Sequence, residues 1–235
     1  TEVSGLVLKN FGDKFLNTSF KEDTVIGINQ KSTINNLKIL LILDQTGSQD
    51  AFQIPIADAI ETFVAKLRAG PFRNISFALF GFSDPVASGN LIRLDYTEDY
   101  DLIKSTIKSG DFAAGGDDVE PGMSGVIQGM SAFPDADEVI LLTDNPAKDP
   151  FLTGSALRSL AFTRFHVSLF NTDDNLIANF GNNVIFYETL ATQTGGIVVR
   201  STSPVENFTA VVDYITANAK SIRLLSFTGA NYGMS

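Results

Sequence analysis

The sequence predicts an α/β fold: a doubly wound, mainly parallel β-sheet with helices on both faces. Continuously apolar segments, such as LKILLIL at residues 37–43, are typical of strands that are buried on both faces. These segments alternate with segments whose apolar residues recur at helical spacing, which indicates parallel strands joined by helical crossovers. The composition, with 44% hydrophobic and 19% charged residues, is that of a globular protein.

The elements follow one another in a regular order along the chain. The predicted strands span residues 37–43, 75–82, 137–143, 164–170 and 196–201. The predicted helices lie around residues 56–67, 98–108, 121–132, 153–161, 183–193 and 204–215. Each helix separates two strands or follows the last one, as a doubly wound sheet requires.

Local signals place the ends of the first and last helices. Gly70 is followed by proline and ends the first helix, and Pro55 suits the first turn of that helix better than its interior. Ser203 and Glu206 have the spacing of a capping box, with Pro204 between them at the first helical position. The last helix is therefore expected to begin at Pro204.

The chain divides into one main domain and two short ends. Residues 37–221 contain the alternating pattern and form the main domain. Residues 1–36 do not fit the alternation and are expected to form an N-terminal β arm or annex. Residues 222–235 are expected to form a C-terminal strand or tail. No apolar run is long enough for a membrane span.

Charge and cysteine content exclude several classes of function. The net charge of −10 argues against a nucleic-acid-binding surface, which needs clustered Lys and Arg, but it is compatible with divalent cations. The absence of cysteine excludes disulfides, zinc–thiolate sites and cysteine nucleophiles.

Oxygen-bearing side chains follow the predicted strands at the points where these strands end. Asp44, Thr46 and Ser48 follow the first strand, and Asp144 follows the third. A glycine-rich loop at 112–121 adds two further acids, at positions 117 and 118. Because ligands bind at the carboxyl ends of strands in open α/β sheets, we expect these side chains to converge. Carboxylates and hydroxyls without His or Cys favour Mg²⁺, Ca²⁺ or Mn²⁺.

Three loop motifs, DQTGSQ at 44–49, GGDDVEP at 115–121 and TDNPAKD at 143–149, resemble the von Willebrand factor type A domain. The branch of that family found in hemicentin-like extracellular matrix proteins is the most similar. FYETLATQTGGIVV at 186–199 also resembles the penultimate helix and last strand of that branch. The resemblance covers about residues 37–221 and implies the doubly wound fold, an extracellular, secreted location and a metal-ion-dependent adhesion site.

Carried over by position, the family's metal ligands fall on Asp44, Thr46, Ser48, Asp118 and Asp144. The glycine-rich loop departs from the branch pattern, because Asp117 stands at its third glycine and Val119 at its cysteine. Asp117 is therefore a possible additional ligand, although Asp118 aligns with the family's aspartate. Gln49 departs in the same way, since it stands where the branch usually has methionine.

Several of these residues also have a simpler interpretation without a metal ion. Asp44 and Thr46 could act only as a helix N-cap, since Asp and Thr are favoured there. His166 lies in the middle of a predicted strand and is expected to be a packing or surface residue. Lys148 is expected to be a solvated loop charge.

Three functions remain to be weighed. The first is a non-enzymatic adhesion or matrix scaffold domain that binds protein ligands, or copies of itself, through the loops at the strand ends and the N-terminal arm. Three carboxylates would over-neutralise a divalent ion, so the ion would be at least partly structural. The second is a structural assembly module whose metal site has decayed. The third is a Mg²⁺-dependent phosphoryl-transfer enzyme. That class usually has a D-x-D loop, whereas this loop reads Asp44, Gln45, Thr46, which argues against it.

Overall fold

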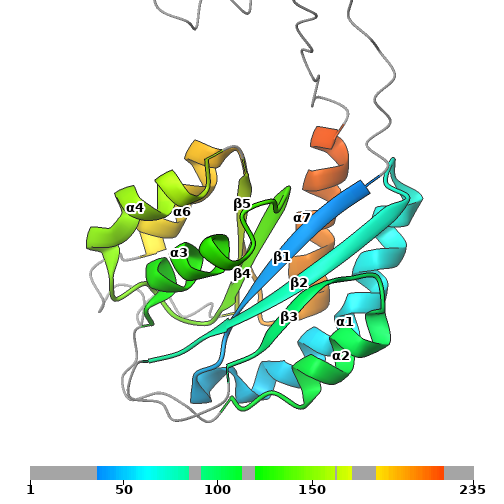
Figure 1. Ribbon diagram of the computed structural model, residues 1–235, viewed down its shortest axis with the longest axis horizontal. Helices are drawn as coiled ribbons and strands as arrows, with labels where there is room; N and C mark the ends of the chain where they lie inside the picture. Colours follow the sequence, from blue (N-terminus) through cyan, green and yellow to red (C-terminus); the bar gives the residue numbers. More distant parts are fainter. Residues whose placement is uncertain (1–35, 85–90, 113–119, 162, 171–183, 220–235) are drawn as a thin grey trace, which may run out of the picture. The chain divides into compact units, whose positions relative to one another are not determined.

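The computed structural model of the chain describes residues 36–84, 91–112, 120–161, 163–170 and 184–219. These residues contain a six-stranded sheet in the order β3-β2-β1-β4-β5-β6 (Figure 1). Neighbouring strands are parallel except β2 and β3, which are antiparallel. The strands are β1 (Asn36–Asp44), β2 (Asn74–Phe82), β3 (Arg93–Thr97), β4 (Glu138–Thr143), β5 (Arg164–Leu169) and β6 (Val198–Arg200). The predicted fold class is therefore confirmed.

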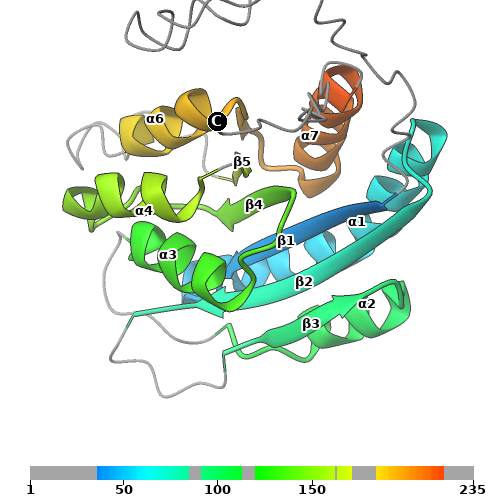
Figure 2. The same ribbon diagram turned by 45° about the horizontal axis from the view of Figure 1, so that its top comes forward.

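Helices cover both faces of this sheet (Figures 1 and 2). One face carries α1 (Asp50–Ala69), α2 (Tyr100–Lys108) and α7 (Pro204–Ala219), and in this layer α1 contacts both other helices. The other face carries α3 (Gly122–Ala132), α4 (Thr153–Ser159) and α6 (Val184–Thr194), where α4 contacts both neighbours. Short 3-10 helices, η3 (Gly47–Gln49) and η4 (Pro150–Leu152), precede α1 and α4. None of the described helices is both long and apolar enough to cross a bilayer.

Strand β1 shows why the sheet is buried on both sides. Its side chains alternate between the faces, as in any strand. Leu41 and Leu43 pack in the core beneath α1 and α7, whereas Leu40 and Ile42 pack in the core beneath α3 and α4. All four are fully buried, so the alternation of this strand is between two cores instead of between core and water.

Two local expectations were wrong. Strand β3 was not predicted, because its five residues are only half-buried or exposed and include Arg93 and Asp95, so the period-two signal is weak. Helix α1 begins at Asp50, which places Pro55 inside the helix. Proline cannot donate to the carbonyl of Ala51, four residues earlier, but Ala51 lies on the exposed surface, where water can donate instead.

The predicted capping box at the start of α7 is half formed. The Glu206 N–H donates to Ser203 Oγ over 3.3 Å, as expected. The Glu206 carboxylate, however, accepts from Ser201 Oγ over 2.5 Å, and that same oxygen accepts the Ser203 N–H over 3.1 Å. Ser201 thus relays the contact that a capping box makes directly. The proposed annex of residues 1–36 and the tail of residues 222–235 fall outside the described residues, apart from Asn36.

Candidate metal centre at the carboxyl edge of the sheet

Strands β1 and β4 lie side by side at the centre of the sheet, and the order of strands reverses between them. Leu43 of β1 pairs with Leu142 of β4, so Asp44 and Thr143 leave the sheet as neighbours. This is the switch point at which open α/β sheets bind their ligands, on the edge where the parallel strands end. We call this edge the carboxyl edge, and the opposite one the amino edge.

Asp44 is almost fully enclosed, with 1% of its surface exposed. Its Oδ2 accepts a hydrogen bond from Thr143 Oγ1 over 2.7 Å. Its Oδ1 accepts from the Thr46 N–H over 3.1 Å and from Thr46 Oγ1 over 2.7 Å. Both carboxylate oxygens are therefore held, and the loop after β1 curls back on the residue that starts it.

The second predicted carboxylate joins the same cluster. Asp144 Oδ1 accepts from Ser48 Oγ over 3.1 Å and from Asn145 Nδ2 over 3.1 Å. Ser48 Oγ in turn lies 3.4 Å from Thr46 Oγ1. The structure thus brings together Asp44, Thr46, Ser48 and Asp144, whereas Asp117 and Asp118 lie outside the described residues.

The helix-cap interpretation of this loop is wrong. Neither Thr46, at the N-cap of η3, nor Gln49, at the N-cap of α1, makes a side-chain capping hydrogen bond. The Asp44 carboxylate binds its own loop and β4 instead of the free amides of a helix. The acid and hydroxyls therefore require another explanation.

The electrostatics of the cluster favour a cation. The pKa of Asp44 is raised to about 7, chiefly by burial and also by the charge of Asp144, while the hydrogen bonds from Thr143 and Thr46 act in the opposite direction. A positive ion beside the two carboxylates would favour their ionised forms. The donors are carboxylate and hydroxyl oxygens, which suit Mg²⁺, Ca²⁺ or Mn²⁺. The described segments alone hold no group of three acidic or histidine side chains suited to a metal ion, so a third acid would have to come from elsewhere.

The loop after β4 also holds the start of α3. The Asp149 carboxylate accepts from the Met123 N–H over 3.0 Å, from the Ser124 N–H over 2.7 Å and from Ser124 Oγ over 2.6 Å. The backbone of Glu120 bonds to this loop twice, to the Pro146 carbonyl over 3.0 Å and from the Lys148 amide over 2.8 Å. The backbone of Glu120, two residues after Asp118 in the sequence, is therefore hydrogen-bonded to the segment that follows Asp144.

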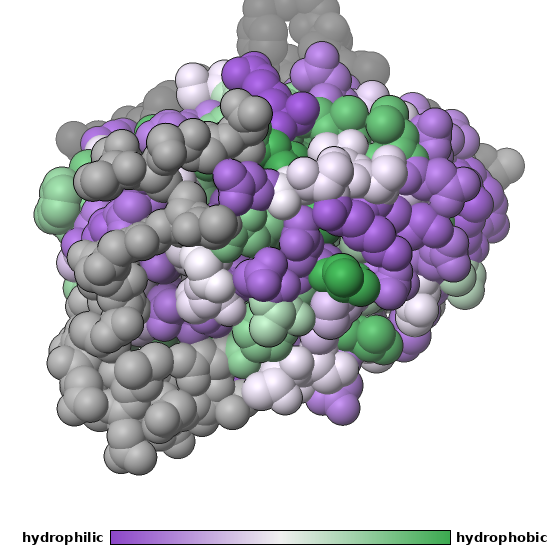
Figure 3. Space-filling model, turned by 90° about the horizontal axis from the view of Figure 1, so that it is seen from below, coloured by the Kyte–Doolittle hydropathy of each residue, from purple (hydrophilic) through white to green (hydrophobic). Residues whose placement is uncertain are grey.

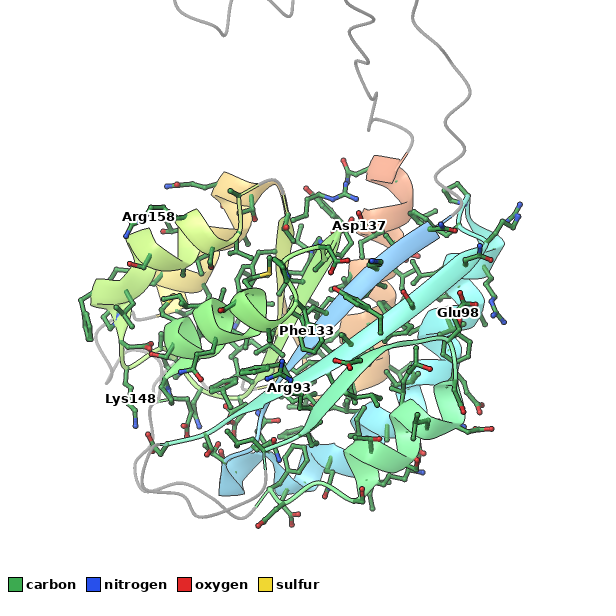
Figure 4. All side chains as sticks on the ribbon, in the orientation of Figure 1. Arg93, Glu98, Phe133, Asp137, Lys148 and Arg158 are labelled. Carbon is green, nitrogen blue, oxygen red and sulfur yellow. The ribbon has the colours of Figure 1, made fainter. Side chains whose placement is uncertain are left out.

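Lys148 is not the solvated loop charge that was expected. Its ammonium group pairs with Asp84, which follows β2 and is 6% exposed. Partial burial lowers the pKa of Lys148, and the charges of Asp149 and Asp44 act in the opposite direction. Lys148 lies at the carboxyl edge, which is at the bottom of Figure 4. It thus links the loop after β4 to the loop after β2.

Gln45 has a role that its place in the motif did not suggest. Its Nε2 donates to the Asp111 carbonyl over 2.9 Å, and its Oε1 accepts the Ile92 N–H over 2.6 Å. A Cβ at Gly81 would lie 1.7 Å from Gln45 Oε1, so only glycine leaves room for this side chain. The amide joins the β1 end to residues 92 and 111.

His166 is a packing residue, as predicted, but it is also part of a polar network. Its Nε2 lies 2.9 Å from Glu138 Oε2, and its Nδ1 lies 3.3 Å from the Ile197 amide. Arg164 pairs with the same Glu138 through its Nε, 2.8 Å from Oε1. His166 is fully buried in β5, and both Glu138 and Ile197 lie outside the carboxyl-edge loops.

Comparisons with known proteins agree with this fold. The chain resembles three solved structures, each with the same type of fold. They are BatB from Bacteroides thetaiotaomicron (16% identity, 78% of this chain and 99% of that chain, TM-score 0.54), the PilB minor pilin from Streptococcus sanguinis (15%, 83% and 64%, 0.52), and the pilus adhesin SpaC from Lactobacillus rhamnosus GG (12%, 80% and 30%, 0.54).

The chain spans under two thirds of the PilB structure and under one third of the SpaC structure, so in those proteins the domain is one part of a longer chain. No curated protein matches the sequence. The model of the von Willebrand factor A domain matches residues 38–203, which is well over half of the chain and includes both described carboxylates of the cluster. This protein therefore belongs to the von Willebrand factor A domain family.

Proposed function

We propose that this domain is an extracellular adhesion or matrix scaffold domain that binds a divalent cation at the carboxyl edge of its sheet. The observation that carries the proposal is the buried carboxylate of Asp44, which accepts hydrogen bonds from Thr46 and Thr143. Ser48 lies between this group and Asp144, because its hydroxyl is 3.4 Å from Thr46 Oγ1 and donates to Asp144. Asp44, Thr46, Ser48 and Asp144 would hold Mg²⁺ or Ca²⁺, with Mn²⁺ as a further candidate. Asp118, or Asp117 beside it, would supply the third carboxylate.

The charge of the site determines how a partner would bind. Three carboxylates around a divalent ion leave a net negative charge, which holds the ion well but attracts an anionic partner less strongly. The ion would therefore be partly structural, and the surrounding loops would make much of the contact with a protein ligand or another copy of the chain. The tight loop hydrogen bonds support this division of roles, because they keep the ligands in place.

The same residues support a role without catalysis. Thr46 stands where a D-x-D loop has its second acid, and its hydroxyl donates to Asp44 over 2.7 Å, so this position offers no second carboxylate. The chain has one histidine, and it lies buried on Glu138. The extracellular location is supported by the resemblance to hemicentin-like matrix proteins, and the similar SpaC structure is that of a pilus adhesin.

Isothermal titration calorimetry with Mg²⁺, Ca²⁺ and Mn²⁺ tests the proposal. The wild-type chain is expected to bind at least one of these ions, and Asp44→Ala and Asp144→Ala are expected to abolish binding. Asp101→Asn is a matched control, because this acid is 91% exposed on α2, away from the carboxyl-edge loops. Asp117→Asn and Asp118→Asn, measured separately, identify the third carboxylate.

Two outcomes would change the proposal. If the wild-type chain binds no divalent ion and shows no thermal shift, the domain is a structural module with a decayed metal site. If a Mg²⁺-dependent phosphatase activity appears and is lost in Asp44→Asn, the domain is an enzyme of the phosphoryl-transfer class.

A further inference from the structure

Tyr187 is fully buried, and its hydroxyl has no hydrogen-bond partner among the described residues. The ring belongs to the core between the sheet and the layer of α3, α4 and α6. Phenylalanine would fill this part of the core equally well, whereas a buried hydroxyl without a partner costs free energy. Such groups are rare in native proteins, and each one calls for an explanation.

Tyr187 lies at the carboxyl edge of the sheet, where the candidate metal centre is. It is in the first turn of α6, which follows β5 and precedes β6 in the chain. Because β5 and β6 are parallel, the helix between them runs back along the sheet and begins at the carboxyl edge. The described surface seen from this edge is mainly hydrophilic (Figure 3), but Tyr187 has no exposed surface, so its hydroxyl is closed to bulk water.

The chain leaves room for the hydroxyl at the first residue of α3, which is Gly122. A Cβ at this glycine would lie 2.0 Å from the Tyr187 hydroxyl oxygen, so a larger residue would displace it. The amides of the next two residues of α3 donate to Asp149, in the loop that follows β4. The hydroxyl is therefore placed where α3 meets this loop, which begins with Asp144.

Several acidic side chains act on the hydroxyl. The pKa of Tyr187 is raised well above its ordinary value, chiefly by burial and also by the negative charges of Asp44, Asp149, Glu120 and Asp144. The charge of Asp44 has the largest effect of these four. The phenol thus keeps its proton at neutral pH, and it stands near both described carboxylates of the candidate centre as a hydrogen-bond donor.

The described acids do not take this hydrogen bond themselves. Both oxygens of Asp44 accept from Thr46 and Thr143, and both oxygens of Asp149 accept from the start of α3. A cation at the acids brings further oxygen atoms to the centre, because Mg²⁺ keeps several of its waters and Ca²⁺ binds water beside carboxylates. Residues around metal sites commonly hydrogen-bond to the groups that the metal holds, and a buried O–H beside the acids suits this role.

We propose that Tyr187 is a positioning residue of the candidate metal centre, whose hydroxyl donates a hydrogen bond to an oxygen that the bound cation holds. That oxygen belongs to a coordinated water or to a carboxylate of the centre, and the two sources lead to different ion selectivity. The inference deepens the divalent-cation site proposed above and rests on it.

Calorimetry of the full chain with Mg²⁺ and with Ca²⁺, each added alone, tests this role. Tyr187→Phe is expected to weaken ion binding by roughly 10–100-fold, the usual effect of removing a group that orients a metal ligand. If the hydroxyl donates to a coordinated water, Mg²⁺ binding falls more than Ca²⁺ binding, because Mg²⁺ gives up its waters reluctantly. If it donates to a carboxylate, both fall alike. Unchanged binding of both ions would overturn the proposal.

Tyr96→Phe is the matched control. The Tyr96 hydroxyl also lacks a partner among the described residues. Its ring lies 5.1 Å from Lys38 Nζ, near the start of β1, and so toward the amino edge. Tyr96→Phe is expected to bind both ions as the wild type does. A loss of affinity equal to that in Tyr187→Phe would show that the site responds to any such hydroxyl, and would overturn the assignment of Tyr187.

Tyrosine absorption gives a readout that a purely structural role would not change. The chain has five tyrosines and no tryptophan, so its near-ultraviolet absorption reports mainly on tyrosine. Saturating ion is expected to shift this absorption in the wild type and in Tyr96→Phe, because the Tyr187 hydroxyl gains its partner only when the ion is bound. Tyr187→Phe is expected to show no shift, and a shift that survives in this variant would contradict the proposal.

Urea unfolding in EDTA separates the role of Tyr187 from a contribution to folding. Tyr187→Phe is expected to be at least as stable as the wild type without the ion, because the hydroxyl lacks a partner there. Lower stability of the ion-free variant would assign the hydroxyl a structural role and overturn the proposal. A wild type that binds no cation removes the metal site and this inference together. A wild type whose binding is lost in Asp44→Ala but kept in Tyr187→Phe removes this inference alone.

Discussion

Thr143 Oγ1 donates a 2.7 Å hydrogen bond to Asp44 Oδ2, and so joins the ends of β4 and β1 at a buried carboxylate. The side chain of Thr143 is itself fully buried, and its oxygen also accepts the Asn145 N–H over 3.3 Å. One hydroxyl thus organises both carboxylates of the candidate centre, because Asn145 binds Asp144.

Thr143→Val is expected to reduce the free energy of unfolding by about 1–3 kcal/mol, since it leaves a buried carboxylate oxygen without a donor. It should also weaken divalent-ion binding by roughly 10–100-fold, the usual effect of removing a group that orients a metal ligand. Urea unfolding and calorimetry measure the two effects. Thr143→Ser keeps the hydroxyl and is expected to retain most of both properties, so an equal loss in Thr143→Ser would contradict this role.

The stability of the metal-free domain is expected to fall as the pH rises from about 4 to about 7. The pKa of Asp44 is about 7 in the folded domain and 3.8 in its ordinary state. Between these values the folded chain binds a proton that the unfolded chain has lost, so raising the pH favours unfolding. The difference in pKa corresponds to on the order of 4 kcal/mol.

Thermal unfolding in EDTA across this pH range measures the fall. Asp44→Asn is expected to flatten the profile because it cannot ionise. Saturating Mg²⁺ or Ca²⁺ is expected to reverse the loss above pH 7, since a bound cation favours the ionised carboxylate. A profile that is identical in wild type and Asp44→Asn would contradict the assignment.

Gly81→Ala is expected to destabilise the domain by more than about 2 kcal/mol. The added methyl group would occupy the place of the Gln45 amide, which would then lose its hydrogen bonds to Ile92 and Asp111. Gly154→Ala is a contrasting control, because the nearest neighbouring side-chain atom to its Cβ is 3.8 Å away on Arg158. That change, in helix α4, is expected to stabilise by roughly 0.5–1 kcal/mol, so urea unfolding should move the two variants in opposite directions.

Much of the fold follows from the sequence because burial on both faces leaves a strong signal. β1 and β4 are continuous apolar runs, and their predicted bounds differ from the observed ones by one residue at each end or less. β3 gave no such signal, since it lies at the sheet edge, pairs on one side and exposes Arg93. Edge strands are often short and charged, which prevents pairing with other chains, and the same features weaken their sequence signal.

The candidate centre, like the fold, was predictable from the sequence only in part. Asp44, Thr46 and Ser48 are near in sequence, and their spacing together with Asp144 was enough to predict that they meet. The role of Gln45 was not predictable, because its amide binds residues 47 and 66 positions away, which only the folded chain brings near. Asp149 lay within the recognised motif, yet its contact with α3 also depends on tertiary structure.

Asp149→Ala is expected to destabilise the domain by about 2–4 kcal/mol, because it removes a buried acceptor from two helix amides and from the Ser124 hydroxyl. Hydrogen exchange should quicken first at Met123 and Ser124, at the start of α3.

Asp99→Ala is the matched control. Asp99 caps α2 through one bond from the Leu102 N–H at an exposed position, so its removal should cost about 1 kcal/mol. Because the same loop joins Glu120 to the segment after Asp144, Asp149→Ala should also weaken divalent-ion binding, whereas Asp99→Ala should not. Equal exchange at Met123 in Asp149→Ala and wild type would show that other contacts hold the start of α3.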